Sequence, residues 1–275
     1  MILWRTRMNI MWTGLLLGTL GAISTDLWPV IWIIMELNLI SFLPLIGKRH
    51  TSKKIRLLYF ITQSVGTLLI LTGGILLCSF LKWVLLGLLL KGSFAPFHFW
   101  GLIILPNINW TRSFVFLTWQ KVTPVCLLFA TVTKRYLVVV VLLNVIFASL
   151  CRVGSKSLII LLFFSGLMQA GWIFSSSFST GVLYLFYYII LIWPIFLCLD
   201  SLNLSLQIFN LAGLPPFTGF LLKLEVLTLA EFNLGVLLLF SSLFMLYSYL
   251  RVFLFSMSNG ALHWLTAVVL FIGIL

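Results

Sequence analysis

Charged side chains inside apolar segments are the residues of this sequence that could do chemistry. Lys121 lies in "LTWQKVTP", within an apolar stretch long enough to cross a bilayer, and Glu36 lies in "WPVIWIIMELNLISFLP". A lysine near the centre of such a segment costs about 2.5–3.5 kcal/mol to insert into a membrane. Because an ionisable residue at this depth needs a partner, we predict that Glu36 is the partner of Lys121. A carboxylate that approaches or leaves a buried lysine changes the protonation of the lysine, so the pair predicts proton loading.

Prolines beside the buried lysines predict local breaks in the helices that carry them. An interior proline removes a backbone hydrogen bond and clashes with the preceding turn. The carbonyls that lose their donors can form a polar pocket beside a lysine at membrane depth, as in ion-carrying membrane proteins. The predicted helix-break residues are Pro124, Pro215 and Pro216, and the further lysine candidates are Lys91, in "KGSFAPFHFW", and Lys223, in "LAGLPPFTGFLLK".

A purely structural role for these charges remains open from the residues alone. A buried pair formed by Glu36 and Lys121 can hold two helices in register. Basic side chains near the ends of segments, such as Lys82, Lys134 and Arg251, can reach the membrane surface with their charged ends.

The composition defines the elements that must position these residues. The chain has 275 residues, of which 62% are hydrophobic and 8% are charged, whereas soluble domains carry about 25% charged residues. We therefore predict an all-α, polytopic transmembrane helical bundle that forms a single membrane domain over residues 1–275. The net charge of +12 does not indicate nucleic-acid binding, because no soluble domain gathers the basic residues. The four cysteines lack metal-ligand spacing, so no metal site is expected.

Charges, prolines and polar clusters divide the chain into about eleven apolar spans. Basic residues are the more frequent on the side of the membrane that holds the N-terminus, which predicts a cytoplasmic or matrix location for that end. The predicted spans are 8–24, 27–47, 56–80, 83–105, 113–132, 136–151, 157–175, 180–199, 206–224, 234–256 and 261–275.

Six motifs, which follow one another along most of the chain, resemble a known family. The motifs that carry the resemblance are "MELNLISFLPL", "YFITQSVGTLLIL", "KGSFAPFHFW", "LTWQKVTPVCLL", "SGLMQAGW" and "LAGLPPFTGFLLK". With these motifs the chain is similar to subunit 2 of the mitochondrial NADH–ubiquinone oxidoreductase, respiratory complex I, in its short animal form.

The resemblance implies an antiporter-like subunit with two broken helices in the membrane arm of complex I, in the mitochondrial inner membrane. It implies a role in proton translocation coupled to electron transfer from NADH to ubiquinone, with Glu36, Lys121, Lys223 and Lys91 at family positions. FMN, iron–sulfur clusters and the quinone are expected in other subunits. No cofactor or metal is expected in this chain. The implied partners are other membrane-arm subunits, including neighbouring antiporter-like subunits, and phospholipids such as cardiolipin, with no nucleic acid.

The middle of the implied proton relay departs from the family pattern. Alignment on "AGW" places Ile160 where the family has a lysine and Gln169 where it has a histidine. Lys156 lies one helical turn before Ile160 and is the replacement candidate. Two alternatives therefore remain open: a free-standing cation/proton antiporter, and a subunit of the same complex that no longer pumps.

Overall fold

A computed structural model describes residues 2–46, 53–75, 80–152, 157–197, 201–215 and 217–257. The predicted span 261–275 and the candidates Lys156 and Pro216 lie outside these residues. The described part of the chain is helical and contains no strand, which confirms the predicted fold class.

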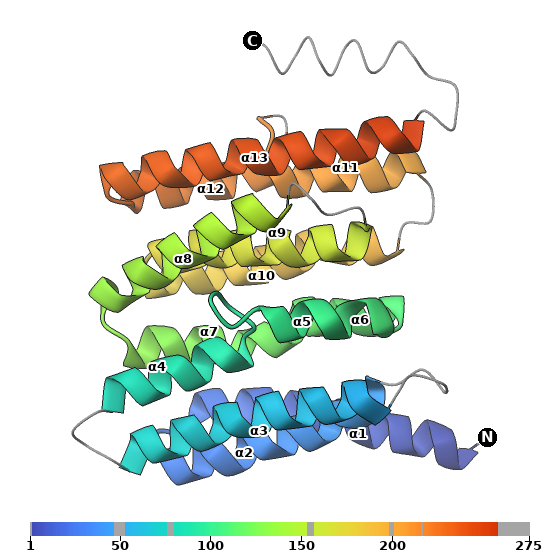
Figure 1. The fold of residues 1–275 in the computed structure, drawn as a ribbon, viewed down its shortest axis with the longest axis vertical. Helices are drawn as coiled ribbons and strands as arrows, with labels where there is room; N and C mark the ends of the chain where they lie inside the picture. Colours follow the sequence, from blue (N-terminus) through green and yellow to red (C-terminus); the bar gives the residue numbers. More distant parts are fainter. Residues whose placement is uncertain are drawn as a thin grey trace.

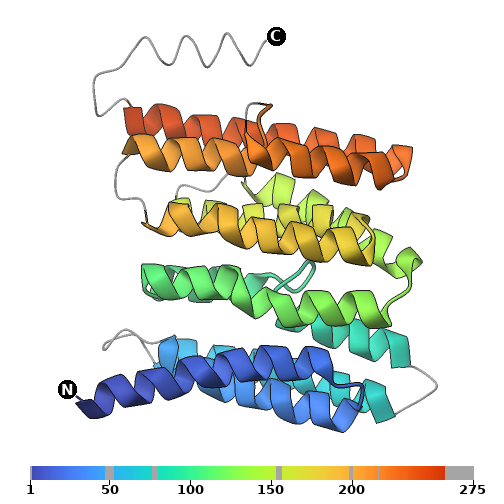
Figure 2. The same cartoon turned by 180° about the vertical axis from the view of Figure 1, so that it is seen from behind.

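The helices lie roughly side by side and stack in tiers along the long axis of the molecule (Figure 1). The first tier holds α1 to α3, the next α4 to α7, the third α8 to α10 and the last α11 to α13, and the view from behind has the same order (Figure 2). The helices are α1 (Ile2–Ser24), α2 (Trp28–Phe42), α3 (Lys53–Ile75), α4 (Phe80–Lys91), α5 (Phe99–Ile104), α6 (Trp110–Leu117), α7 (Trp119–Thr131), α8 (Lys134–Arg152), α9 (Leu158–Ser175), α10 (Phe178–Leu197), α11 (Ser201–Ala212), α12 (Thr218–Leu229) and α13 (Phe232–Met257), with short 3-10 turns at Leu43–Leu45 and Leu105–Asn107.

Seven helical segments of the described chain are long and apolar enough to cross a membrane, and Met11–Ser24 is a shorter apolar helix. Large apolar side chains stand exposed on the outside of the bundle, including Leu17, Leu150 and Phe232. In a soluble protein so much exposed apolar surface would be unfavourable, whereas lipid tails solvate it. The chain is therefore a multi-pass membrane protein.

Helix α9 lies at the centre of the bundle. Every side chain from Leu161 to Phe174 is buried, including the polar residues Ser165 and Gln169. The helix packs against α8, α10, α12 and α13, so it separates the tier that carries α7 from the tier that carries α12. Lys121 on α7 and Lys223 on α12 lie in the tiers on either side of this helix (Figure 1).

The predicted spans 83–105 and 206–224 are each interrupted in the structure, so neither is one continuous helix. The second interruption falls at Gly213 and Leu214, beside the predicted prolines. The first was not predicted: α4 ends at Lys91, and Ser93 has a positive φ of 50° before α5 begins. Gly92 and Pro96 are poor helix formers, but apolar content alone does not tell a broken span from a whole one.

A buried asparagine from α8 holds the break between α4 and α5. The side chain of Asn144, which is fully buried, accepts a hydrogen bond of 3.0 Å from the backbone N–H of Ala95 and donates one of 2.9 Å to the carbonyl of Val140. Backbone groups in a membrane must be satisfied inside the protein, so the polar side chain replaces the hydrogen bond that the broken helix lost.

We expect Asn144→Leu to destabilise the protein by about 1–3 kcal/mol, because the buried N–H of Ala95 loses its acceptor. Thermal melting of the detergent-solubilised protein measures this change. Asn107→Leu is the matched control, because the Asn107 amide bonds a carbonyl of its own helical turn near the surface. Equal melting temperatures for the two variants would contradict the role given to Asn144.

Candidate functional site

Lys121 is buried at the start of α7, directly after an interruption of the helix. The interruption is Thr118, whose ψ of −72° and φ of −113° separate α6 from α7. Pro124 was predicted as the break itself but lies inside α7. A proline disturbs the turn that precedes it, which is the turn that contains Lys121.

The ammonium group of Lys121 lies in an aromatic surround. The side chain is 4% exposed, and its Nζ lies 5.8 Å from the ring centroid of Phe94 and 5.7 Å from that of Phe163. The negative faces of the rings stabilise a cation. Nζ has no hydrogen-bond partner among the described residues. An unpaired ammonium in an apolar interior is costly, so Lys121 is set up to exchange its proton.

Glu36 lies on α2 and does not pair directly with Lys121. Its carboxylate accepts a hydrogen bond from the hydroxyl of Thr67 on α3. No ion pair between Glu36 and Lys121 occurs in the described structure, so the coupling that the sequence predicts needs intermediates.

A small polar cavity, with a volume of about 10 Å³, is bordered by Lys91 and by residues of α2, α3 and α7. That volume is about the room of one water molecule. A hydrogen bond of 3.2 Å from the side-chain amide of Gln120 to the side-chain oxygen of Asn38 joins α7 to α2 at the edge of this cavity. The cavity is lined by Met35, Asn38, Leu39, Tyr59, Gln63, Lys91, Gln120, Thr123 and Pro124. Lys91 therefore shares one polar cavity with Gln120 and Thr123, which lie on either side of Lys121 in the sequence.

Lys223 occupies the second broken helix. It lies on α12, is 6% exposed, and donates a hydrogen bond from Nζ to the carbonyl of Ala212, the last residue of α11. Carbonyls at the end of a helix lack partners and carry partial negative charge, so they suit an ammonium group. Nζ also lies 5.5 Å from the ring centroid of Trp172 on α9.

Two residues give the second break its shape. Gly213 has a φ of 78°, a conformation that a residue without a Cβ adopts readily. The side chain of Asn210 then accepts hydrogen bonds from the N–H of Gly219, at 3.1 Å, and from the hydroxyl of Thr218, at 3.2 Å. Asn210 thereby satisfies the start of α12 from the end of α11.

The middle of the implied proton relay contains Gln169, at the position where the resemblance implies a histidine. Gln169 is 2% exposed, accepts a hydrogen bond of 2.5 Å from the hydroxyl of Tyr184, and donates one of 3.1 Å to the carbonyl of Leu211. Ile160 is half-buried in the first turn of α9 and packs against the core. Gln169 thus connects α10 to the second break, and Tyr184 was not among the predicted site residues.

Arg152, the residue that follows the predicted span 136–151, is buried in the structure. It lies in the last turn of α8 and is 1% exposed. Its guanidinium group lies 4.1 Å from the ring centroid of Tyr249 and hydrogen-bonds Ser248 and Met245. The three partners belong to α13, far along the chain, so no local pattern reveals them.

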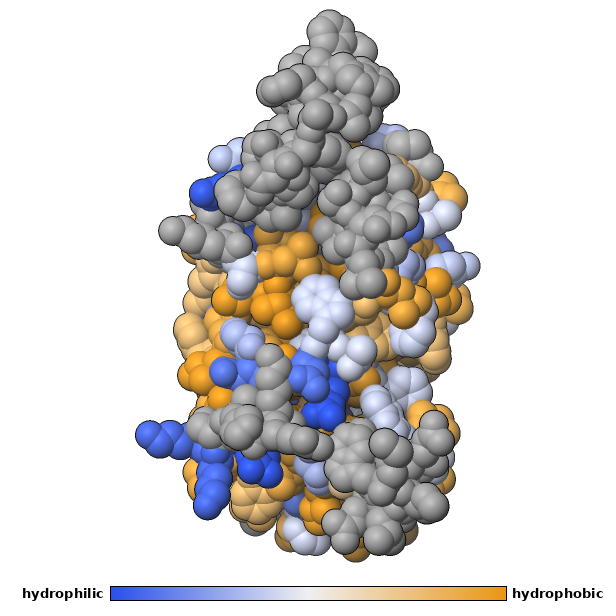
Figure 3. Space-filling view, turned by 90° about the vertical axis from the view of Figure 1, so that its right-hand side faces the viewer, coloured by the Kyte–Doolittle hydropathy of each residue, from blue (hydrophilic) through white to orange (hydrophobic). Residues whose placement is uncertain are grey.

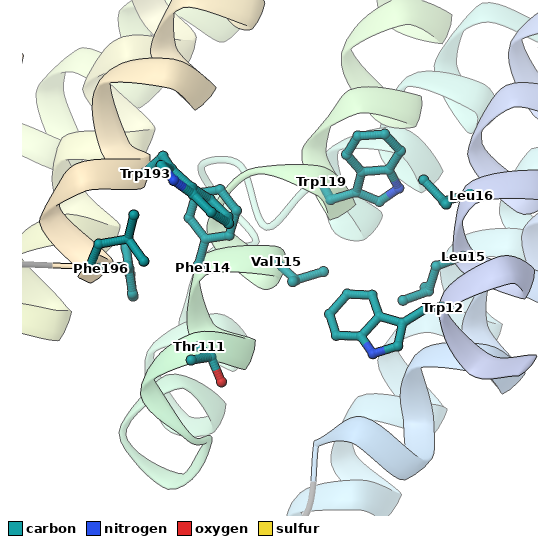
Figure 4. A pocket seen from close by; sticks show the side chains of 10 residues that line it. Trp12, Leu15, Leu16, Thr111, Phe114, Val115, Trp119, Trp193 and Phe196 are labelled. Atoms are coloured by element: carbon teal, nitrogen blue, oxygen red, sulfur yellow. The ribbon is translucent and has the colours of Figure 1, made fainter. Parts of the chain in front are cut away.

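A second cavity, of about 350 Å³, opens between α1, α6, α7 and α10 (Figure 4). Rings of Trp12, Phe114, Trp119 and Trp193 border it, and none of its lining residues is ionisable. Its lining is apolar and includes none of the buried lysines. Within the described residues, no group of three His, Cys, Asp or Glu side chains could hold a metal ion.

Comparison with known proteins relates this arrangement to one family. No protein-family model matches the chain. The chain is 30% identical to NADH-ubiquinone oxidoreductase chain 2 of Anopheles gambiae, over 89% of this chain and 84% of the relative. It is 32% identical to the protein of the same name from Aedes aegypti, with the same coverage.

A solved structure has the same fold. A chain of respiratory complex I from Thermus thermophilus matches with a TM-score of 0.79 at 21% identity, over 90% of this chain and 70% of that one. The similarity in sequence to the insect proteins extends over most of both chains. This chain therefore belongs to the NADH-ubiquinone oxidoreductase chain 2 family.

Proposed function

We propose that this chain is an antiporter-like subunit of the membrane arm of respiratory complex I and translocates protons as electrons pass from NADH to ubiquinone. The single observation that carries the proposal is a repeated arrangement: two buried lysines, Lys121 and Lys223, each next to an interrupted helix. Helix interruptions beside buried charge are typical of ion paths at membrane depth.

The proposed path starts at Glu36 and the polar cavity around Lys91, continues to Lys121, and ends at Lys223. Buried lysines change protonation when nearby charges move, so charge changes in neighbouring subunits would load and empty them. The proposed partners are other membrane-arm subunits, including neighbouring antiporter-like subunits. Redox chemistry belongs to other subunits in this proposal.

The proposed location is the mitochondrial inner membrane, with the N-terminus on the matrix side. The distribution of exposed basic residues supports this orientation, because α3 begins with Lys53, Lys54 and Arg56. Figure 3 looks onto the side of the molecule at which α3 begins, and hydrophilic residues gather on the lower part of that side. Positive charge is typical of the side from which a membrane protein is inserted.

Phospholipids such as cardiolipin are proposed for the apolar cavity between α1 and α10. Its lining suits an acyl chain, and Thr111 from α6 is the polar residue that borders it. The next residue, Arg112, lies on the side that we assign to the matrix, where a phosphate headgroup would meet basic side chains.

We expect Lys121→Ala to lower the number of protons pumped per NADH oxidised, because the buried proton carrier is lost. The measurement uses the assembled complex reconstituted in vesicles, with assembly checked on native gels. Lys82→Ala is the control, because Lys82 is an exposed lysine of α4. Normal proton output from a fully assembled Lys121→Ala complex would refute the proposed function. A small free particle in place of a large complex on the native gel would favour a free-standing antiporter.

A further inference from the structure

Two tyrosines of α10 bury their hydroxyl groups in the region between Lys121 and Lys223. Tyr184 and Tyr188 are 4% and 3% exposed, whereas Tyr187 is 48% exposed on the outside of the bundle. Residues four apart lie on the same side of a helix, so the two buried rings form one row along α10. This row packs against α9.

The hydroxyl of Tyr188 and the ammonium of Lys121 both lie over Gly166 of α9. If Gly166 of α9 carried a Cβ, that atom would lie 2.8 Å from Nζ of Lys121 and 2.8 Å from the hydroxyl oxygen of Tyr188. The two polar groups therefore approach the same point from α7 and α10. Neither has a hydrogen-bond partner among the described residues. A buried polar group without a partner is costly. Passing a proton from the Lys121 ammonium to the Tyr188 hydroxyl would give both groups a partner.

The hydroxyl of Tyr184 lies one turn further, beside Gln169. It donates to the Gln169 side-chain oxygen at 2.5 Å, and the Gln169 amide donates to the carbonyl of Leu211 at 3.1 Å. The next carbonyl, that of Ala212, accepts the hydrogen bond of Lys223. Gly166 and Gln169 are three residues apart on α9, so the pairs 166–188 and 169–184 lie in register along the α9–α10 contact.

We propose that the hydroxyl groups of Tyr188 and Tyr184 relay protons from Lys121 toward Lys223 across the stretch where Ile160 and Gln169 cannot titrate. The proposal rests on the proposed function of the chain. Gln169 is a positioning residue in this scheme: it holds the Tyr184 hydroxyl and the end of α11 together.

The relay step leaves each tyrosine neutral. The Lys121 ammonium gives a proton to the Tyr188 oxygen while Tyr188 passes its own hydroxyl proton to a water molecule. That water protonates the Tyr184 oxygen as Tyr184 breaks its hydrogen bond to the Gln169 side-chain oxygen and releases its hydroxyl proton to a second water. The amine of Lys223 takes the proton from this second water. Lys121 ends as an amine and Lys223 as an ammonium, so the step needs water and no oxidant or reductant.

The test compares Tyr188→Phe, Tyr184→Phe and the control Tyr187→Phe in the assembled complex, alongside Lys121→Ala. Each of the three tyrosine variants loses one oxygen atom and keeps its ring, so packing is preserved. We expect both buried variants to assemble and to lose proton output per NADH down to the level of Lys121→Ala, while Tyr187→Phe matches the wild type. A merely structural role would change assembly without changing the number of protons per NADH.

Three other outcomes would each overturn the relay or the proposed function. Normal proton output from an assembled Tyr188→Phe or Tyr184→Phe complex, with low output from Lys121→Ala, would overturn the relay and leave the proposed function intact. Normal output from Lys121→Ala would overturn the proposed function itself. If neither phenylalanine variant assembles, the hydroxyls serve the fold, and the relay is also overturned.

Discussion

Gly166→Ala is expected to give a folded, assembled protein that pumps few protons. The new Cβ would lie 2.8 Å from both Nζ of Lys121 and the hydroxyl of Tyr188, closer than real contacts allow. Both atoms are at the ends of side chains, and the lysine is long and flexible, so the ammonium group moves away while the helices stay in place. Alanine also favours the helix over glycine by up to about 1 kcal/mol. We therefore expect pumping to fall while the melting temperature stays close to that of the wild type.

The measurement pairs thermal melting of the solubilised complex with proton output per NADH in vesicles. Gly171→Ala, in the same helix, is the matched control, because its Cβ would meet a methyl group of Val145 at 2.9 Å and no polar group of the site. We expect this control to pump normally. Undiminished pumping by Gly166→Ala would mean that the position of the Lys121 ammonium over α9 has no functional role.

Gly213→Ala is expected to damage both the fold and the function of the second break. An L-residue with a Cβ costs about 1–2 kcal/mol in the left-handed conformation, and Gly213 has a φ of 78°. The Cβ would also lie 2.9 Å from Nζ and Cδ of Lys223 and 3.0 Å from its Cε. Lys223 would therefore lose its hydrogen bond to the carbonyl of Ala212.

Gly213→Asn separates the effect of backbone strain from the effect of the clash with Lys223. Asparagine tolerates the left-handed conformation better than alanine does, so it relieves the backbone strain but keeps the clash with Lys223. We expect Gly213→Asn to melt at a higher temperature than Gly213→Ala and to pump equally poorly. Gly235→Ala is the control, with an ordinary contact of 3.4 Å to Leu227. Normal pumping by both Gly213 variants would show that Lys223 works without this carbonyl.

Much of the fold could be predicted because its signals are local. An apolar segment with a single lysine and a proline is visible in the sequence, and the interrupted helices next to Lys121 and Lys223 were expected for that reason. The break after Lys91 was missed, because Asn144, the residue that satisfies it, belongs to another helix. The eleven predicted spans likewise counted interrupted segments as whole helices.

The sequence by itself determined the class of the protein, its family and the identity of its buried lysines. Only the tertiary structure decided that Glu36 bonds Thr67, that Arg152 is buried against α13, and that the ends of Tyr188 and Lys121 lie over the same glycine. In water, an alternation of polar and apolar residues reveals which side of a helix is buried. In a membrane both the lipid-facing and the inward sides are apolar, so this signal is absent. Which polar groups meet is then decided by helix packing alone.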